Sequence, residues 1–381
     1  NGFYHAYNTI NLDLKNKSAD VKHLDLMLEG QVAALSSGAL NIDDTIKLLE
    51  SLFTSDLYRA DMHSFILYPK KEITPFLHKN IIPSSNISKS KLLSKMLENN
   101  DRTLIEIDAG KQIRFRSQFR NSFDLEAKLN KLKNETKYNS LVTREHDLVM
   151  EIFEKVFDHR NYTGRSGTMF SYEGIGSVYW HMVSKLLLAV QENYFRAVRM
   201  KEPVEKVKKI GHLYYDIRSG LSAGKTSQEY GAFPFDPYSH TPAHSGAQQP
   251  GMTGQVKEEI LTRFGELGCF VQNGKILFDT SLLRRSEFLD KPKLFSYYNF
   301  KAEKKELRIE ENQLAFTLCQ IPIIYALTDK KYSIGLVLEN GKSLNLEGKE
   351  IDKEMSDAIF KRTGKIRLIH FNCQKYDLIF Q

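Results

Sequence analysis

The stretch Gly268-Cys-Phe-Val-Gln-Asn-Gly-Lys-Ile-Leu-Phe-Asp279 marks the point where the periodicity of the chain changes. Before it, apolar residues recur with the helical period of about 3.6 residues, and after it they alternate with polar residues as strands do. Asn273-Gly274 separates two short apolar runs, as does Asn340-Gly341 later in the chain, and both pairs are strong hairpin signals. The sequence therefore predicts a helical region over 1–268 and a β-rich domain over 269–381.

The composition is that of a globular protein of more than one domain. The chain has 381 residues, more than the ~250–300 at which single cores usually split. Its 54 basic and 47 acidic residues are spread along the chain, and the lack of a basic block argues against nucleic-acid binding. No apolar run approaches the ~20 residues of a membrane span. The three cysteines lie far apart, so both the cytoplasm and the periplasm stay open as compartments.

Several helices of the first region can be placed from their apolar faces. One is expected after Asn41, which is followed by acidic residues that suit a helix N-terminus. The longest should run from about Ser177 to Met200 and be deeply buried, because its apolar residues cover more than half of its circumference. Another begins near Pro203. Between these helices, Thr103–Phe119 alternates like paired strands and predicts a small β insertion.

The polar loop that ends at Gly254 is the most informative stretch for function. It carries Asp236, Tyr238, His240, His244, Ser245 and Thr253 and runs directly into a helix N-terminus. Backbone N–H groups there, with hydroxyls and an imidazole, would suit an anion or sugar hydroxyls. The alternative is that Thr253 only caps the helix and that both histidines face solvent. No metal is expected, since Pro242 interrupts the histidine pair and no third ligand follows.

A second loop, Tyr162–Gly174, offers Arg165 and Glu173 among glycines and aromatic residues. A carboxyl in such surroundings can act as a general acid, although Glu173 could equally be a helix N-terminal charge. Trp180, on the next helix, could stack on a sugar ring or belong to the core. Tyr4 and His5 belong to a polar-aromatic string of the kind that lines saccharide clefts, although Tyr and His also occur at the seams between domains.

These segments together resemble a known family. Gly251-Met-Thr-Gly254 at a helix start, followed by 268–279 entering β structure, resembles the end of the catalytic toroid in cellobiose phosphorylase-like enzymes and related (α/α)6 glycosidases. Leu28–Gly38 looks like an inner helix of that toroid, and Ser343–Ile351 like closing strands of its β appendage. The resemblance covers about 25–40 and 145–350.

The resemblance implies a mainly α chain, an (α/α) toroid, complete or partial, followed by an antiparallel β domain. It also implies a carbohydrate-active enzyme that cleaves or phosphorolyses glycosidic bonds, with an oligosaccharide substrate and inorganic phosphate as co-substrate. Thr253 and Gly254 would hold the phosphate with His240 or His244, Arg165 and Ser245. Glu173 or Asp236 would be the acid, and sugar contacts would come from Tyr4, His5, Trp180 and Tyr238.

One departure from the family keeps a second hypothesis open. A Trp-Asn-Asp-type general-acid segment is not found in the sequence. Because the chain starts without Met, we expect it to be the C-terminal part of a longer protein, whose N-terminal part would be its partner and could supply the acid. The alternative is a non-catalytic carbohydrate-binding or assembly component.

Overall fold

A computed structural model describes most of the chain, namely residues 2–6, 8–13, 16–23, 26–69, 78, 80–134, 137–157, 177–221, 240–242 and 255–380. The chain divides into two compact units. Unit 1 comprises Asn1–Ala6, Leu28–Phe65 and Val178–Gln381, and unit 2 comprises Tyr7–Met27 and Ile66–Ser177.

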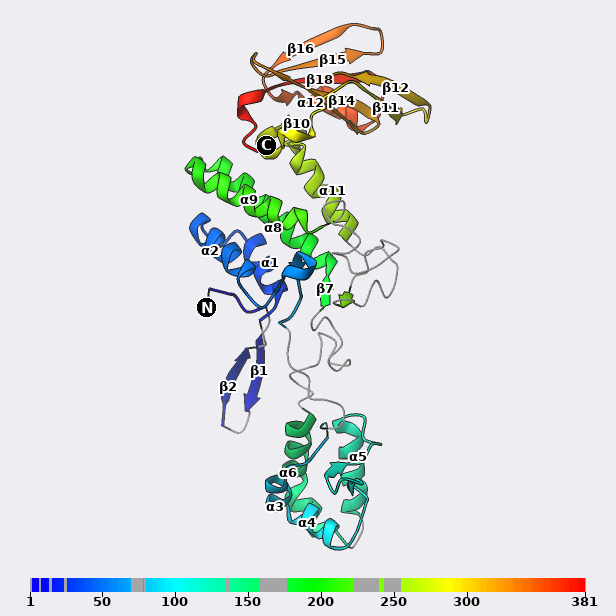
Figure 1. Cartoon of the computed structure of the whole chain (residues 1–381). Helices are drawn as coiled ribbons and strands as arrows, with labels where there is room; N and C mark the ends of the chain where they lie inside the picture. Colours follow the sequence, from blue (N-terminus) through cyan, green and yellow to red (C-terminus); the bar gives the residue numbers. More distant parts are fainter. Residues whose placement is uncertain are drawn as a thin grey trace. The chain divides into compact units, whose positions relative to one another are not determined.

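The helical part of unit 1 is built around one long, buried helix, α8 (Trp180–Arg199). Its neighbours are α1 (Leu28–Ser36), α2 (Ile42–Phe53), α9 (Val204–Ser219) and α11 (Gln255–Glu266), and all four contact it. The arrangement can be followed in Figure 1. Asn41 caps α2 by accepting a hydrogen bond from the Asp44 amide, as its position before the acidic pair predicts. A short hairpin, β3 (Tyr58–Arg59) and β4 (Ser64–Phe65), flanks the 3-10 turn Ala60–Met62.

The β-rich part of unit 1 begins at Cys269, shortly after the end of α11. Its elements are β9 (Cys269–Gln272), β10 (Lys275–Phe278), β11 (Lys293–Tyr298), β12 (Lys304–Ile309), β13 (Gln313–Leu318), β14 (Ile321–Thr328), β15 (Ser333–Leu338), β16 (Ser343–Glu347), β17 (Glu350–Ile351), α12 (Lys353–Phe360), β18 (Ile366–Gln374) and the 3-10 turns Thr280–Leu282, Arg285–Glu287 and Lys375–Asp377. They form a three-stranded sheet β17-β10-β9, a hairpin β11-β12 and a five-stranded sheet β13-β14-β18-β15-β16. The β-rich segment predicted after Gly268 is therefore present.

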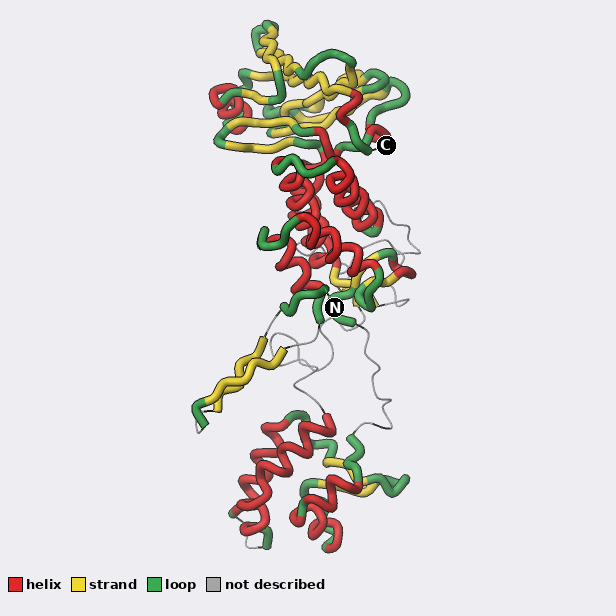
Figure 2. Tube along the Cα trace, turned by 90° about the vertical axis from the view of Figure 1, so that its left-hand side faces the viewer, coloured by secondary structure: helices red, strands yellow, loops and turns green. Residues whose placement is uncertain are grey.

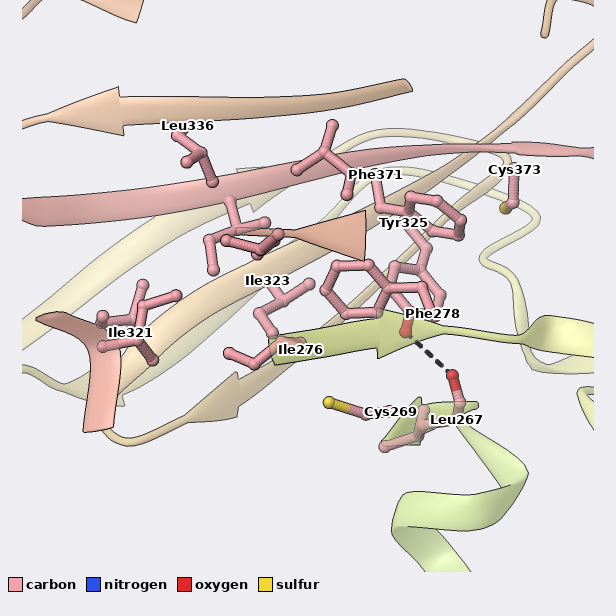
Figure 3. Close-up of a cluster of buried hydrophobic side chains, with 14 of the residues drawn as sticks. Leu267, Cys269, Ile276, Phe278, Ile321, Ile323, Tyr325, Leu336, Phe371 and Cys373 are labelled. Carbon is pink, nitrogen blue, oxygen red and sulfur yellow. Dashed lines mark hydrogen bonds between the residues drawn. The ribbon is translucent and has the colours of Figure 1, made fainter. Parts of the chain in front are cut away.

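An aromatic core joins the two larger sheets. Phe278, Tyr325 and Phe371 are fully buried and pack against one another, as Figure 3 shows. The Tyr325 hydroxyl donates to the Leu267 carbonyl at 2.8 Å, which satisfies a carbonyl at the end of α11. Gly268 is required at this point, because its φ is +68° and a Cβ would lie 1.8 Å from the Asp279 oxygen.

Unit 2 has a separate helical core. Its elements are the hairpin β1 (Asn8–Asp13) and β2 (Ser18–His23), then α3 (Ser84–Lys89), α4 (Lys91–Glu98), β5 (Ile105–Ile107), β6 (Ile113–Phe115), α5 (Ser122–Lys133) and α6 (Asn139–Phe157). Figure 2 distinguishes these helices and strands by colour. Leu93, Leu129 and Phe153, from three different helices, are completely buried in this core. Strands β5 and β6 fall inside the predicted 103–119 segment.

The predicted fold class is wrong in three respects. Helix accounts for 44% and strand for 27% of the structure, so the chain is mixed rather than mainly α. The described helices also form no (α/α) toroid, because α3 to α6 have their own core in unit 2 and cannot continue a ring with the helices around α8. In addition, β14 and β18 are parallel, so the five-stranded sheet is not purely antiparallel.

Candidate functional site

Most residues of the predicted site lie outside the described part of the chain. These are Arg165, Glu173, Asp236, Tyr238, His244, Ser245, Thr253 and Gly254. The backbone of His240 is described: it begins β8 (His240–Pro242), which pairs with β7 (Ser177–Tyr179), the strand that leads into α8. Helix α11 begins directly after Gly254. The described residues that follow the two predicted loops therefore lead into the first turns of α8 and α11.

Tyr4, His5 and Trp180 can be placed individually. The Tyr4 backbone is held by the buried Gln31, which accepts from its amide at 2.9 Å and donates to its carbonyl at 2.7 Å. The side chains of Tyr4 and His5 are exposed. Trp180 is completely buried. It therefore occupies a core position, which was the alternative to stacking on a sugar ring.

A polar cluster joins the first turns of α8 and α11. His181 Nε2 lies 3.2 Å from Glu258 Oε1, and the side chain of Glu258 is only 4% exposed. Tyr179 Oη lies 3.4 Å from His181 Nδ1, and Lys257 Nζ lies 3.5 Å from Glu258 Oε1. His181 thus lies between Tyr179 and Glu258, and all three side chains can carry or transfer protons.

This cluster is incompletely satisfied. Among the described residues, neither His181 Nε2 nor Glu258 Oε2 has an aligned hydrogen-bond partner, although both atoms are buried. A buried polar atom without a partner costs about 1–3 kcal/mol, and more when it is charged. The helix dipole of α11 offsets part of this cost for Glu258, which lies in its first turn. Such unsatisfied buried groups are explained by strain, by a functional role or by a bound water or ion.

Neither His181 nor Glu258 was predicted as a site residue from the sequence. Glu258 could have been found from a polar stripe along α11, since Glu258, Thr262 and Glu266 follow one another at four-residue intervals. All three are buried, with exposed fractions of 3%, 1% and 3%. The proximity of His181 to Glu258 could not have been found from sequence, because it joins two helices that are far apart in the chain.

The other end of the same stripe carries a network in which both oxygens of Glu266 are hydrogen-bonded. Glu266 Oε1 accepts from the Tyr214 hydroxyl at 2.7 Å and from Arg218 Nε at 2.9 Å, and Oε2 accepts from an Arg263 guanidinium nitrogen at 2.8 Å. Burial, and then the charge of Glu266, raises the pKa of Tyr214 well above its usual value. Arg263 also pairs with Glu287 at 2.5 Å. Every oxygen of Glu266 is used, so this network has a structural role.

Neither a metal cluster nor a membrane-spanning helix is found in the described ranges. No group of three or more His, Cys, Asp and Glu side chains among those residues could hold a metal ion. Their helices are also too short or too polar to cross a bilayer.

The comparison with protein families concerns unit 2. Residues 73–160 match the family model described as GH149 phosphorylase insertion domain 2. This segment contains α3 to α6 with β5 and β6, and it covers less than a quarter of the chain. No curated protein matches the chain. The match relates the chain to glycoside phosphorylases through this domain, and it does not support the cellobiose phosphorylase-like toroid.

Proposed function

We propose that this chain belongs to a carbohydrate-active enzyme that cleaves glycosidic bonds by phosphorolysis. The observation that carries this proposal is the match of residues 73–160 to an insertion domain of GH149 phosphorylases. The contact between His181 and Glu258 supports it, because Glu258 lies in the first turn of α11, directly after the predicted phosphate loop ends at Gly254.

His181 extends the predicted anion site. Glu258 lies where it can orient the imidazole through Nε2, as carboxylates commonly orient functional histidines. His181 is the second residue of α8, where first-turn N–H groups and the helix dipole favour an anion. In this proposal His181 and the hydroxyl of Thr253 contact one phosphate, together with Gly254, Ser245, Arg165 and His240 or His244.

The chemistry then requires a carboxylic acid and a bound sugar. Glu173 or Asp236 would protonate the leaving glycosidic oxygen while phosphate attacks the anomeric carbon. The sugar contacts would be Tyr4, His5 and Tyr238. Trp180 is left out because its indole is buried.

Thermal melts with and without phosphate test the anion site. Phosphate should stabilise the protein by about 2.7 kcal/mol at 100 times its dissociation constant. Thr253→Ala and His181→Ala should each reduce this shift by removing a contact, whereas Thr54→Ala, at the C-terminal cap of α2, should not. Sodium chloride of equal ionic strength is the salt control. Equal shifts in both salts, or shifts that neither site variant changes, would disprove the site.

The alternative is a non-catalytic carbohydrate-binding or assembly component. The absence of a Trp-Asn-Asp-type segment from the sequence favours it. The discriminating assay is release of sugar 1-phosphate from β-linked gluco-oligosaccharides, because a binding component retains affinity for them without forming this product. The protein with any upstream coding sequence should be assayed beside the 381-residue chain.

A further inference from the structure

The turn that precedes β4 holds His63 in a conformation that few side chains adopt. Its φ is 47° and its ψ is 40°, in the left-handed region. A residue other than glycine stays in this region only where its surroundings hold it there, and such residues cluster at functional sites. The His63 amide donates to the Ala60 carbonyl at 3.2 Å, and Arg59 Nε donates to Asp61 Oδ1 at 2.7 Å across the same turn. The strained conformation of His63 is therefore fixed by the hairpin that carries it.

The imidazole of His63 contacts the last residue of α9. His63 Nε2 lies 3.1 Å from Ser219 Oγ. The Ser219 hydroxyl donates to the Asp216 carbonyl at 2.7 Å. Because a serine hydroxyl has a single hydrogen, the imidazole is the donor in its contact with Ser219. An N–H group on residue 63 thus holds the C-terminal end of α9.

The backbone of His63 also approaches the end of α9 closely. Gly220 is the C-terminal cap of this helix, and its φ of −83° is open to any residue. A Cβ on Gly220 would nevertheless lie 2.0 Å from the His63 carbonyl oxygen, so the close approach of the two backbones requires glycine. Leu221 follows and is completely buried. Residue 63 therefore fixes both the side chain of Ser219 and the backbone of Gly220.

This end of α9 lies at the same end of a helix pair as His181. Helices α8 and α9 pack against each other and are joined by the short turn 200–203, so they form an antiparallel pair. The C-terminal end of α9 is therefore at the end of the pair where α8 begins, and His181 is the second residue of α8. Leu221 is also the last described residue before the stretch that carries Asp236. The contacts of His63 thus fix the point at which the chain enters the predicted site loop.

We propose that His63 is a positioning residue of the phosphate site, which it supports by fixing the end of α9 through its Nε2–H group and its carbonyl. The ligand rests on the proposed function, whereas the strained turn and the contacts with Ser219 and Gly220 are properties of the fold. His63 does not itself contact phosphate in this proposal. A displacement of about 1 Å in the elements that carry a site can cost about 100-fold in rate, so loss of the contact with Ser219 should weaken the site from a distance.

A matched pair of variants isolates the N–H group of residue 63. His63→Gln keeps a side-chain N–H donor of similar reach, whereas His63→Met has a similar length and no donor. Titration of the full chain with inorganic phosphate, followed by thermal melts, gives the dissociation constant of each protein. We expect at least about tenfold weaker phosphate binding for His63→Met and a value within about threefold of the native one for His63→Gln. A residue with only a structural role would change the unfolding temperature and leave the dissociation constant unchanged.

Hydrogen exchange without phosphate gives a second readout. The Gly220 amide donates to the Ile217 carbonyl and the Leu221 amide to the Arg218 carbonyl. Both amides should exchange at least about tenfold faster in His63→Met than in the native chain or in His63→Gln, because the end of α9 has lost its donor. Lys201→Met is the matched control, since Lys201 is also left-handed, with a φ of 55°, but lies at the opposite end of the helix pair. It should match the native chain in both readouts.

The results separate a failure of this role from a failure of the phosphate site. Native phosphate affinity in His63→Met, or native exchange at Gly220 and Leu221, overturns the positioning role and leaves the phosphate site in place. Equal weakening by His63→Gln and His63→Met also overturns it, because the N–H group would then not matter. Absence of a phosphate-specific effect in the native chain would disprove the phosphate site itself, and with it the positioning role, before any variant is compared.

Discussion

Helix α11 carries two buried carboxylates in opposite states. Glu266, at its C-terminal end, has three hydrogen-bond donors. Glu258, in its first turn, has an unaligned imidazole, a lysine at 3.5 Å and one oxygen without a partner among the described residues. Both are 3% exposed, so burial does not separate them. The two carboxylates differ instead in whether their oxygens have hydrogen-bond partners. The comparison indicates that Glu266 holds the helices together and that Glu258 belongs to a site.

The largest expected effect follows from breaking the satisfied end. Glu266→Gln keeps the shape of the side chain but leaves Arg218 and Arg263 without their shared carboxylate. Removing one partner from a buried charged network typically costs about 3–5 kcal/mol, and we expect a loss near the lower limit because both arginines are partly exposed. Urea unfolding followed by the fluorescence of Trp180, the single tryptophan, measures this change in the helical part of unit 1. A loss below about 1 kcal/mol, the net value of one ordinary hydrogen bond, would contradict the structural role.

Asp101, in unit 2, is a second well-bonded carboxylate and should give an intermediate effect. Burial acts to raise its pKa, but hydrogen bonds from Thr103, Tyr138 and Lys137 outweigh burial and lower the pKa from 3.8 to about 2. Because the folded pKa lies below the ordinary value, its stabilisation is complete above about pH 4 and is lost as pH falls through about 2, and Asp101→Asn should cost about 2 kcal/mol at pH 7. Hydrogen exchange of α4 and α6 amides at pH 7 and pH 3 measures it. A variant with the same pH dependence as the native chain would exclude this role.

The unsatisfied end of α11 should respond weakly. Glu258→Gln removes a buried charge whose second oxygen has no partner in the described part of the chain. We therefore expect the free energy of unfolding to change by less than about 1 kcal/mol, the size of a helix-dipole contribution. The same variant should reduce the phosphate-dependent shift, because His181 loses the group that orients it. The Trp180 unfolding curve and the phosphate melt together provide the test. A cost as large as that of Glu266→Gln would remove the distinction between the two carboxylates.

The smallest effect is expected at Lys257. Its side chain is 73% exposed, and surface ion pairs of this kind contribute about 0–1 kcal/mol. Lys257→Ala should therefore leave the unfolding curve within about 0.5 kcal/mol of the native one. It is the matched control for Glu258→Gln, and a larger loss would show that the lysine, rather than the imidazole, is the main partner of Glu258.

Local signals in the sequence predicted local structure well. Asn273-Gly274 and Asn340-Gly341 both occupy hairpin turns, and Asn41 caps a helix. The turn at Cys319-Gln320, which joins β13 to β14, has no such signal in the sequence. Both turn residues have positive φ, 49° and 66°, but neither is a residue type that indicates this conformation.

Long-range structure was predicted less well, for a physical reason. The order of helices along the chain does not determine which of them share a core, and a separate core for α3 to α6 could not be seen from their periodicity. The predicted site shows the same limit. Its loop residues could be named from their chemistry, but the approach of His181 to Glu258 depends on how α8 packs on α11, which no local pattern encodes.

The position of β18 constrains the order in which the sheet can assemble. Strands β13 and β14 form one local hairpin and β15 and β16 another, but β18 lies between them and is made after both. Until Ile366–Gln374 emerges during biosynthesis, β14 and β15 each have an unpaired edge, and that of β14 includes the apolar run Ile321–Tyr325. Open apolar edges pair with other chains. Premature termination before residue 366 should therefore yield an aggregating product, and the nascent chain should need protection by chaperones at this stage.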